Sequence, residues 1–488
     1  TPCLSCTRTT AARILLAVVR DCDLSKLEIT SGLGEEALRA EEAAKLAEGA
    51  QGAAAQTNVT TEANLRTALA AYGSASAASE NGKKSLDQWR KKLGDRMIDE
   101  TFAMRGHAEQ HLLTPWFDAE ANRLRDDVFV AAMDLHKAFV DAAAKPLRHN
   151  LSVLMNIFSG RKMPDAAKEA LVPDLWSSLF LVVPAVSTAF ASVERMLGQL
   201  PQEALGWLLI DEAGQALPQA AVGALMRTRK AVVVGDPMQI EPVVVLPDVL
   251  TQAICRTFGV DPDRFNAPSA SVQTLADSAT RYIAEFSSKQ GSRTVGVPLL
   301  VHRRCAEPMF GISNAVAYEH LMVHGTPGRT SPVSDLLGPS RWFDVKGGGA
   351  DKWCPEEGEM VLELLKALRR LNAPPDLYII SPFVIVQENL RGIVQQSGLL
   401  DAWTDEPRAW AYSRIGTVHT VQGREAEAVI LVLGAPATHQ MGARNWAGGR
   451  PNILNVAVTR AREALYVIGN RELWREAGVF RTLDARLH

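Results

Sequence analysis

The fold of this chain is decided by the stretch Leu208-Leu-Ile-Asp-Glu-Ala-Gly-Gln215. A short apolar run of this kind predicts a buried parallel strand, Trp207 to Ile210, that delivers Asp211 and Glu212 to the carboxyl edge of a sheet. At that edge Asp211 can hold Mg2+, and Glu212 can orient and deprotonate the water that attacks a γ-phosphate. Taken alone, the same residues also fit a strand that ends in a solvated acidic turn.

A second apolar run, Ala231-Val-Val-Val234, follows further along the chain. It predicts another buried strand that ends at the same edge, where Gly235 allows a tight turn before Asp236, Pro237 and Gln239. An amide at that place can hydrogen-bond a γ-phosphate oxygen or the attacking water, and so report the nucleotide state to a second domain. Gln239 is therefore the candidate sensor.

Two arginines in the second half of the chain are candidates for the cations that phosphoryl transfer requires. Charge develops on the equatorial phosphate oxygens, and cations brought in across a cleft stabilise it. Arg304 ends the run Leu299-Leu-Val-His-Arg-Arg304, and Arg460 lies on a predicted helix, Asn452 to Arg462. A lone arginine is more often a solvated or surface-paired side chain. The predicted strands on either side of this helix are Ala428–Leu433 and Ala464–Ile468.

Together these segments resemble the superfamily 1 helicases of the Upf-like group, which includes nonsense-decay and replication-associated helicases. The resemblance covers about residues 175 to 475, and it is specific for the superfamily rather than for one biological role. It implies an α/β fold of two RecA-like, doubly wound parallel-sheet lobes of the P-loop NTPase type. The matching segments are Asp211-Glu-Ala-Gly-Gln215 (motif II), Gly235-Asp-Pro-Met-Gln239 (motif III), Leu299 to Cys305 (motif IV), Thr417-Val-His-Thr-Val-Gln-Gly-Arg-Glu425 (motif V) and Asn455-Val-Ala-Val-Thr-Arg-Ala-Arg462 (motif VI).

The resemblance also implies ATP and Mg2+ as cofactors and a role for each matching residue. In motif IV the register favours Arg304 over Arg303 as an arginine finger. The implied roles are Asp211 for the metal, Glu212 for the water, Gln215 for the nucleotide, Gln239 for the γ-phosphate, Arg304 and Arg460 as the two fingers, Glu425 for the ribose and Gly423 for close approach of the backbone.

The resemblance implies a helical insertion inside the first lobe, although the residues alone also fit a surface-exposed helical arm. Residues 1–20 and 171–250 form that lobe, residues 21–170 the insertion, residues 251–295 a connector with one helix, and residues 296–488 the second lobe. Apolar periodicity predicts helices at Glu35–Ala55, Lys84–Glu100 and Asp118–Ala144, a turn between Gly73 and Gly82, a strand at Leu179–Val183, and a strand at Leu377–Phe383 that resembles the family's Thr-Pro-Tyr segment.

The phosphate-binding loop departs from the family pattern. A motor of this type needs Gly-x-x-x-x-Gly-Lys-Thr, whose backbone N–H groups surround the phosphates. The only compatible register is Pro2-Cys-Leu-Ser-Cys-Thr-Arg-Thr9, before a predicted apolar helix from Thr10 to Val19. Arg8 keeps the charge for the phosphates and Thr9 the hydroxyl for Mg2+, but proline and threonine replace both glycines. We expect a poor phosphate cradle and, since the chain starts without Met, a fragment with either a decayed loop or a corrupted terminus.

The composition is that of an intracellular protein with several domains. A chain of 488 residues with 47% hydrophobic content exceeds what one core supports, so we expect two or three domains. Six scattered cysteines do not make a disulfide framework, and Cys3-x-x-Cys6 lacks the second pair that a zinc site requires. No apolar run of about 18 residues and no signal peptide is visible, so we expect a cytoplasmic location and no membrane partner.

The charge balance leaves the partner open, because a net charge of −3 neither demands nor forbids nucleic acid. A helicase channel needs only a local basic groove with stacking platforms, and candidates lie in Trp342–Trp353, in Trp403–Tyr412 and at Arg444–Arg450 with Trp446. The same residues also fit an ordinary role at the surface or in the core. The resemblance implies single-stranded or duplex DNA or RNA as the partner, and the size of the helical insertion makes it a candidate site for a protein partner. Three functions therefore remain: a nucleic-acid-dependent ATPase or helicase, a hydrolysis-deficient nucleic-acid-binding switch, and a partner-docking scaffold.

Overall fold

A computed structural model describes residues 51–113, 119–161, 165–236, 238–267, 269–288, 291–326, 328, 330–349, 351–421 and 423–487. The chain divides into two compact units, residues 1–124 and 125–488. The predicted phosphate-binding loop, including Arg8 and Thr9, and the predicted helix Thr10–Val19 lie outside the described residues, as does most of the predicted helix Glu35–Ala55. No helix within the described ranges is long and apolar enough to cross a membrane.

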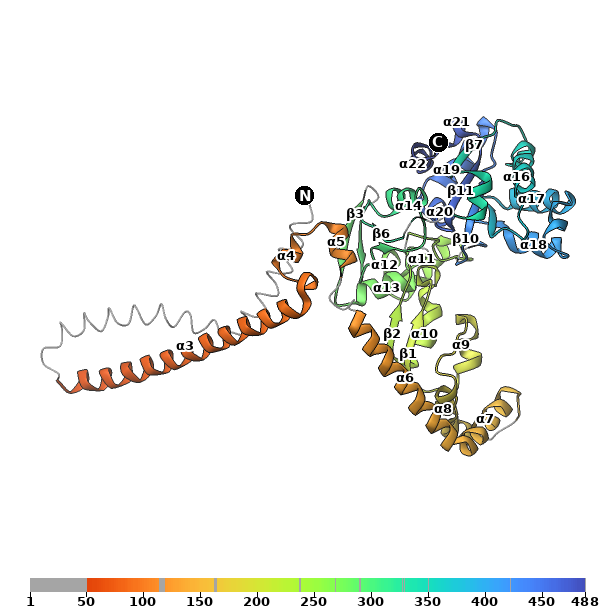
Figure 1. Cartoon of the computed structure of the whole chain (residues 1–488). Coiled ribbons are helices and arrows are strands. Elements are labelled where there is room, and N and C mark those ends of the chain that lie inside the picture. The colour runs from red at the N-terminus through yellow and green to blue at the C-terminus, as the bar shows by residue number, and fades with distance from the viewer. Residues whose placement is uncertain are drawn as a thin grey trace. The chain divides into compact units, whose positions relative to one another are not determined.

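The described part of the first unit is helical, and its main element is α3 (Gln51–Leu93), which is 43 residues long (Figure 1). The predicted turn between Gly73 and Gly82 is wrong, because both glycines lie inside α3. Glycine costs about 1 kcal/mol relative to alanine in a helix, but a long alanine-rich helix propagates readily once it is nucleated. The helices that follow are η1 (Gly94–Arg96), α4 (Glu100–Ala103), α5 (His107–Leu112) and α6 (Ala119–Ala142), which confirms the helix predicted at Asp118–Ala144.

Helix α8 (Asp165–Val182) stands where a strand was predicted at Leu179–Val183, so that prediction is wrong. The buried positions Val172, Leu175 and Trp176 are followed by the partly buried Leu179, which is the i, i+3, i+4, i+7 spacing of a helical face. In a strand, alternate side chains point to opposite faces, so these four residues could not form one apolar stripe. The stripe packs with α7 (Ala144–Phe158) and α9 (Phe190–Leu197).

The first lobe contains a two-stranded parallel sheet in its described part. Strands β1 (Leu205–Ile210) and β2 (Thr228–Val233) pair in register from one end to the other, as the parallel arrangement predicted. The predicted burial is wrong for most of β1, because Trp207 is 63% and Leu209 75% exposed, whereas Ile210 is buried. Only two strands pair here in the described ranges, so the sheet covers little of its own apolar surface. Between the strands lie η2 (Ala213–Gln215) and α10 (Pro218–Met226).

The connector is more structured than the single helix that the sequence predicts. It holds three helices and an antiparallel hairpin of β3 (Ala284–Ser288) and β4 (Gly291–Val295). The hairpin was not predicted, because its strands are short and polar and give no alternating pattern. The connector helices are α11 (Asp248–Thr257), α12 (Pro262–Phe265) and α13 (Val272–Ala279).

The second lobe is a doubly wound parallel sheet, which confirms the predicted fold class. Its strands lie in the order β7-β11-β10-β8-β9, and every neighbouring pair is parallel. The strands are β7 (Arg341–Asp344), β8 (Leu377–Ser381), β9 (Ile415–Thr417), β10 (Ala426–Val432) and β11 (Ala461–Gly469), with a separate parallel pair of β5 (Val301–His302) and β6 (Val323–His324).

Two groups of helices cover this sheet (Figure 1). The first group is α14 (Met309–Ala317), α19 (Met441–Gly448), α20 (Pro451–Thr459) and α22 (Phe480–Arg486), and the second is α15 (Pro332–Leu337), α16 (Pro355–Leu368), α17 (Val384–Gln396) and α18 (Pro407–Arg414). The helix predicted at Asn452–Arg462 is confirmed as α20, but its predicted end is wrong, because Arg460 caps the helix and Ala461 and Arg462 already belong to β11. Short turns of helix complete the lobe: η3 (Leu399–Ala402), η4 (Thr438–Gln440) and α21 (Arg471–Trp474).

The core of the second lobe explains why its strands are continuous apolar runs. All five residues of β8 are buried, as are nearly all of β10, because helices on both faces leave no side of a parallel sheet for water. Buried tryptophans donate their indole N–H groups to backbone carbonyls, from Trp342 to Gly469 at 3.0 Å and from Trp474 to Gly434 at 2.8 Å. Each ring is thereby buried without an unsatisfied donor.

We expect Ile380→Ala to lower the free energy of unfolding of the second lobe by about 2–5 kcal/mol, because Ile380 is fully buried in β8 and its removal leaves a cavity. The control is Val384→Ala, four residues away at the start of α17, where the side chain is 59% exposed and the cost should stay within about 0.5 kcal/mol. Urea unfolding measures both. Equal midpoints for the two variants would contradict the packing described here.

Candidate active site

The loops that follow β1 and β2 are held together by their backbones. The N–H of Ala213 donates to the carbonyl of Val234 at 3.0 Å, and the N–H of Val234 donates to the carbonyl of Ile210 at 2.8 Å. A Cβ atom added to Gly235 would lie 2.8 Å from the nitrogen of Gly214 and 2.9 Å from that of Ala213. Only glycine fits at position 235, so motifs II and III form one rigid edge.

The two acids of motif II are oriented by local hydrogen bonds. Asp211 Oδ1 accepts from the N–H of Glu212 at 2.9 Å, and Glu212 Oε2 accepts from Gln215 Nε2 at 2.9 Å. Glu212 has a left-handed backbone with φ of 52°, a conformation that costs a non-glycine residue about 1 kcal/mol or more and is often found at functional sites. The structure therefore places Gln215 beside the candidate base and leaves the Asp211 side of the edge exposed.

The candidate sensor Gln239 lies in a loop that its own Asp236 shapes. Asp236 Oδ1 accepts from the N–H of Met238 at 2.9 Å, and Oδ2 accepts from Gln239 Nε2 at 3.3 Å. Gln239 Oε1 is buried and has no hydrogen-bond partner in the described part of the chain. A buried acceptor without a donor costs free energy unless a water or ligand supplies one. This amide therefore fits a hydrogen bond to a water molecule at the site.

A buried polar network ties this loop to the second lobe. The Tyr318 hydroxyl donates to Asp236 Oδ2 and accepts from Asn455 Nδ2 at 3.0 Å. Asn455, which is fully buried, also donates to the carbonyl of Met238 at 2.9 Å and accepts from the Ser313 hydroxyl at 2.7 Å. Burial, with the nearby Asp236 carboxylate, raises the pKa of Tyr318 well above its usual value, so the hydroxyl keeps its proton and remains a donor.

Sequence reasoning missed Tyr318, because it lies outside the five motif segments and its partners are far along the chain. Asn455 stood within motif VI without an assigned role. The one available signal was its type, since an asparagine in the otherwise apolar stretch of a predicted helix must satisfy its amide somewhere.

Arg460 lies directly after α20 and is only 1% exposed. Its Nη1 donates to the carbonyl of Arg424 at 2.9 Å and its Nε to that of Val456 at 3.3 Å, while Nη2 is buried and finds no partner within the described residues. Burial lowers the pKa of Arg460, the nearby Arg304 lowers it further, and the Glu212 carboxylate opposes both effects. The base candidate of the first lobe and the finger candidate of the second thus act on one another electrostatically.

Arg304, the other finger candidate, pairs with Glu425. Its Nε lies 2.8 Å from Glu425 Oε2, and Arg462 Nη1 lies 3.5 Å from the other oxygen of that carboxylate. Both partners of the first pair are 41% exposed, so the ion pair is worth at most about 1 kcal/mol and can rearrange when an anion is present. Gly423 has a φ of 76°, which fits the close backbone approach predicted for motif V.

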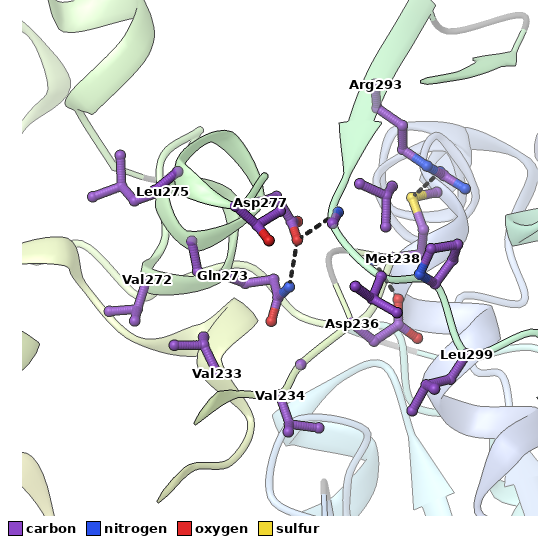
Figure 2. Close-up of a pocket in the computed structure, with 18 of the residues that line it drawn as sticks. Val233, Val234, Asp236, Met238, Val272, Gln273, Leu275, Asp277, Arg293 and Leu299 are labelled. Atoms are coloured by element: carbon purple, nitrogen blue, oxygen red, sulfur yellow. Dashed lines mark hydrogen bonds between the residues drawn. The ribbon is translucent and has the colours of Figure 1, made fainter. Parts of the chain in front are cut away.

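A cavity of about 930 Å³ lies along β2 beside the motif III loop (Figure 2). Asp277 Oδ1 accepts from Gln273 Nε2 at 2.8 Å and from the N–H of Gly296 at 2.9 Å, and Arg293 contacts the sulfur of Met238. These contacts join α13 to the segment at Gly296 and join Arg293 to the motif III loop. The polar groups at this cavity therefore hold the structure together. The cavity is lined by none of Asp211, Glu212, Arg304 and Arg460.

Most of the aromatic candidates for strand binding belong to the core. Trp342, Trp403 and Trp410 are each less than 10% exposed. Arg444 is also buried, and it donates to three backbone carbonyls between positions 435 and 438. The nucleic-acid interpretation of these four residues is therefore wrong, because their side chains are engaged inside the lobe. Trp446 is different, since its ring is 57% exposed.

Comparison with known proteins agrees with this architecture. Family models described as AAA domain match residues 185–246 and 299–472. The chain is 22% identical over 304 residues to the "Uncharacterized ATP-dependent helicase MJ0104" of Methanocaldococcus jannaschii, covering 57% of this chain and 38% of that protein. It is 24% identical over 295 residues to the "DNA polymerase alpha-associated DNA helicase A" of Saccharomyces cerevisiae, covering 56% and 39%, and 25% identical over 308 residues to the "DNA replication ATP-dependent helicase/nuclease DNA2" of Gallus gallus, covering 61% and 26%.

The two matched AAA domains and the three helicase relatives support the resemblance to the Upf-like group of superfamily 1 helicases. The chain spans less than two fifths of the length of these relatives. Among solved structures, the complex of the Arterivirus nonstructural protein 10 helicase with DNA covers 56% of this chain and 41% of its own, at 13% identity and a TM-score of 0.27.

Loss of the Tyr318 hydroxyl should loosen the motif III loop. We expect Tyr318→Phe to speed amide hydrogen exchange at Met238 and Gln239 by at least about fivefold, because Asp236 and Asn455 each lose one hydrogen-bond partner. Tyr412→Phe is the control, since Tyr412 is 58% exposed on α18. Unchanged exchange in the loop would show that Tyr318 does not hold it.

Proposed function

We propose that this chain forms the motor of a nucleic-acid-dependent ATPase that couples ATP hydrolysis to binding, translocation on or unwinding of nucleic acid. One observation carries the proposal: Arg460 of the second lobe is buried with an unpartnered Nη2 atom and interacts electrostatically with Glu212 of the first. A buried guanidinium nitrogen without a partner is costly, and an anionic oxygen is its best partner. The names of the three relatives, all helicases, support the same activity.

The residues at this edge fit ATP with Mg2+. Magnesium is usually bound by one or two carboxylates together with substrate phosphates, and Asp211 offers an exposed carboxylate at the end of β1. We infer that Asp211 and Thr9 hold the metal, that Arg8 contacts phosphate, and that Glu425 meets the ribose. Bound ATP would supply the phosphoryl group and most of the negative charge.

The protein's own residues would then share the work of hydrolysis. Glu212, held by Gln215, accepts a proton from the attacking water, and Gln239 Oε1 accepts a hydrogen bond from the same water. Arg460 Nη2 donates to the oxygens on which charge develops. Arg304 leaves its exposed ion pair with Glu425 and donates to the same phosphate oxygens.

A hydrolysis-deficient switch is the second candidate, and the residues from Pro2 to Thr9 favour it because they replace both glycines of the phosphate cradle. A scaffold role would use the helical insertion, where Leu65, Leu69 and Tyr72 of α3 are exposed. We place the protein in the cytoplasm, since the cysteines that the structure describes, Cys255, Cys305 and Cys354, are free thiols.

The unmodified chain should show negligible ATPase activity, and exchange of residues 2–9 for Gly-Pro-Pro-Gly-Thr-Gly-Lys-Thr, with any missing upstream strand restored, should restore it. In the exchanged chain, Glu212→Gln should reduce turnover by at least about a hundredfold and leave nucleotide affinity nearly intact, because only proton transfer is lost. Phosphate release with single-stranded DNA present measures turnover. Robust, Glu212-dependent hydrolysis by the unmodified chain would show that positions 2–9 form a working cradle, and unchanged turnover in Glu212→Gln would reject the base.

Arg460→Gln should slow hydrolysis in the exchanged chain by roughly a thousandfold, as expected for an arginine finger. The control is Arg481→Ala, whose guanidinium is 75% exposed and remote from motif VI in sequence. Circular dichroism and thermal unfolding establish that the lobe is still folded. A folded Arg460→Gln variant with normal turnover would remove Arg460 from the site.

A further inference from the structure

A second cavity, about 600 Å³, lies between the two lobes. One wall is the segment that follows motif III, with Ile240 and Pro242, and the other is formed by Trp446, Ile453 and His419 of the second lobe. None of the roles assigned above uses this cavity. Its walls are mostly apolar and one of them is aromatic, which is the chemistry of a site for a flat apolar ring rather than for a phosphate.

Trp446 is a fixed platform at this cavity. Its ring is 57% exposed, whereas Trp342, Trp403 and Trp410 are buried. Its centroid lies 5.9 Å from that of the buried Phe383, so one part of the indole is held by the core while the remainder is open. A large aromatic ring held in place and exposed offers stacking surface with little entropy to lose on binding.

The polar groups around the cavity suit a nucleic-acid strand. Burial lowers the pKa of His419, so the imidazole is neutral near pH 7 and does not repel or attract a base by charge. Arg450 is 71% exposed and pairs with Glu241 at 2.6 Å. An exposed ion pair of this kind is weak, so Arg450 is able to turn to a phosphate of a bound strand.

The cavity is connected to the candidate active site through α20. Asn452, in the first turn of that helix, lines the cavity and donates to the backbone carbonyl of Gln239, the candidate sensor. Arg460 follows the last residue of the same nine-residue helix, about 12 Å along the axis from Asn452 at 1.5 Å per residue. A ligand in the cavity would therefore contact Asn452, which binds the backbone of the candidate sensor Gln239. It would act on Arg460, the candidate finger, through a single helix.

We propose that this cavity binds an unpaired nucleobase of a DNA or RNA strand, stacked on Trp446, and that this base is the contact by which the strand acts on the nucleotide site. The proposal rests on the proposed function, because the strand is the partner of that motor. The subsite is the cavity at Trp446, and the part of the strand that it recognises is a base. The bases, and not only the phosphates, contribute to affinity.

The test measures binding of the full chain to end-labelled strands of about twelve nucleotides by fluorescence anisotropy at low salt. Oligodeoxythymidylate and oligouridylate are each compared with an abasic deoxyribose strand of equal length, which keeps the phosphates and lacks the bases. We expect the chain to bind at least one of the two base-bearing strands about tenfold or more tightly than the abasic strand. Trp446→Ala should lower affinity for that base-bearing strand by a similar factor and leave affinity for the abasic strand unchanged.

Two matched variants complete the test. Trp446→Phe keeps a stacking ring and should retain most of the preference for bases, while Trp207→Ala removes another exposed tryptophan that does not line the cavity and should change nothing. Equal binding of base-bearing and abasic strands, or an undiminished preference in Trp446→Ala, would overturn the proposal while leaving a strand-binding motor in place. Failure of the unmodified chain to bind any strand would reject the proposed function and this inference with it.

Discussion

The hydrogen bonds from Tyr318 and Asn455 to the loop of Asp236 and Met238 are the interaction on which the candidate site depends. They cross from the second lobe to the first, and they are satisfied only when the lobes are apposed as here. Separation of the lobes would break the bonds to Asp236 and to the Met238 carbonyl, although the fully buried Asn455 would keep Ser313 and Tyr318 of its own lobe as partners. The loss of these bonds on separation favours discrete docked and undocked arrangements over a continuous series.

Helix α20 connects the parts of the site within the second lobe. Its first turn carries Asn452, which binds the backbone of Gln239, its middle carries Asn455, and Arg460 follows its last residue. Any shift of the motif III loop therefore reaches the buried guanidinium through one short helix. The helix is firmly seated, since every residue from Leu454 to Thr459 is buried. Because α20 is tightly packed, a small displacement of its first turn also moves its last turn.

The two lobes differ in how much of their sheet is enclosed. In the second lobe, five parallel strands with helices on both faces bury β8 completely and β10 almost completely. In the first lobe, β1 and β2 pair only with one another in the described ranges, and Trp207 and Leu209 stay exposed. The edge of the first lobe that carries Asp211 and Glu212 is held by backbone contacts between Gly214 and Gly235 rather than by burial of the sheet.

The sequence by itself determined β1, β2, β8, β10 and β11, the two acids after β1 and the arginines of motifs IV and VI, because apolar runs and strand-end residues are local signals; it gave no signal for the short strands β5, β6, β7 and β9. It misjudged Leu179–Val183 and the turn at Gly73–Gly82, where a short apolar run and isolated glycines fit helix as well as the predicted structure. Only the tertiary structure decided which aromatic and basic side chains are free: Trp342 and Arg444 are engaged inside the lobe, and Trp446 is exposed. It alone also brought Tyr318 to Asp236 and Asn455. These contacts join residues far apart in the chain, and burial depends on how neighbouring elements pack rather than on residue type.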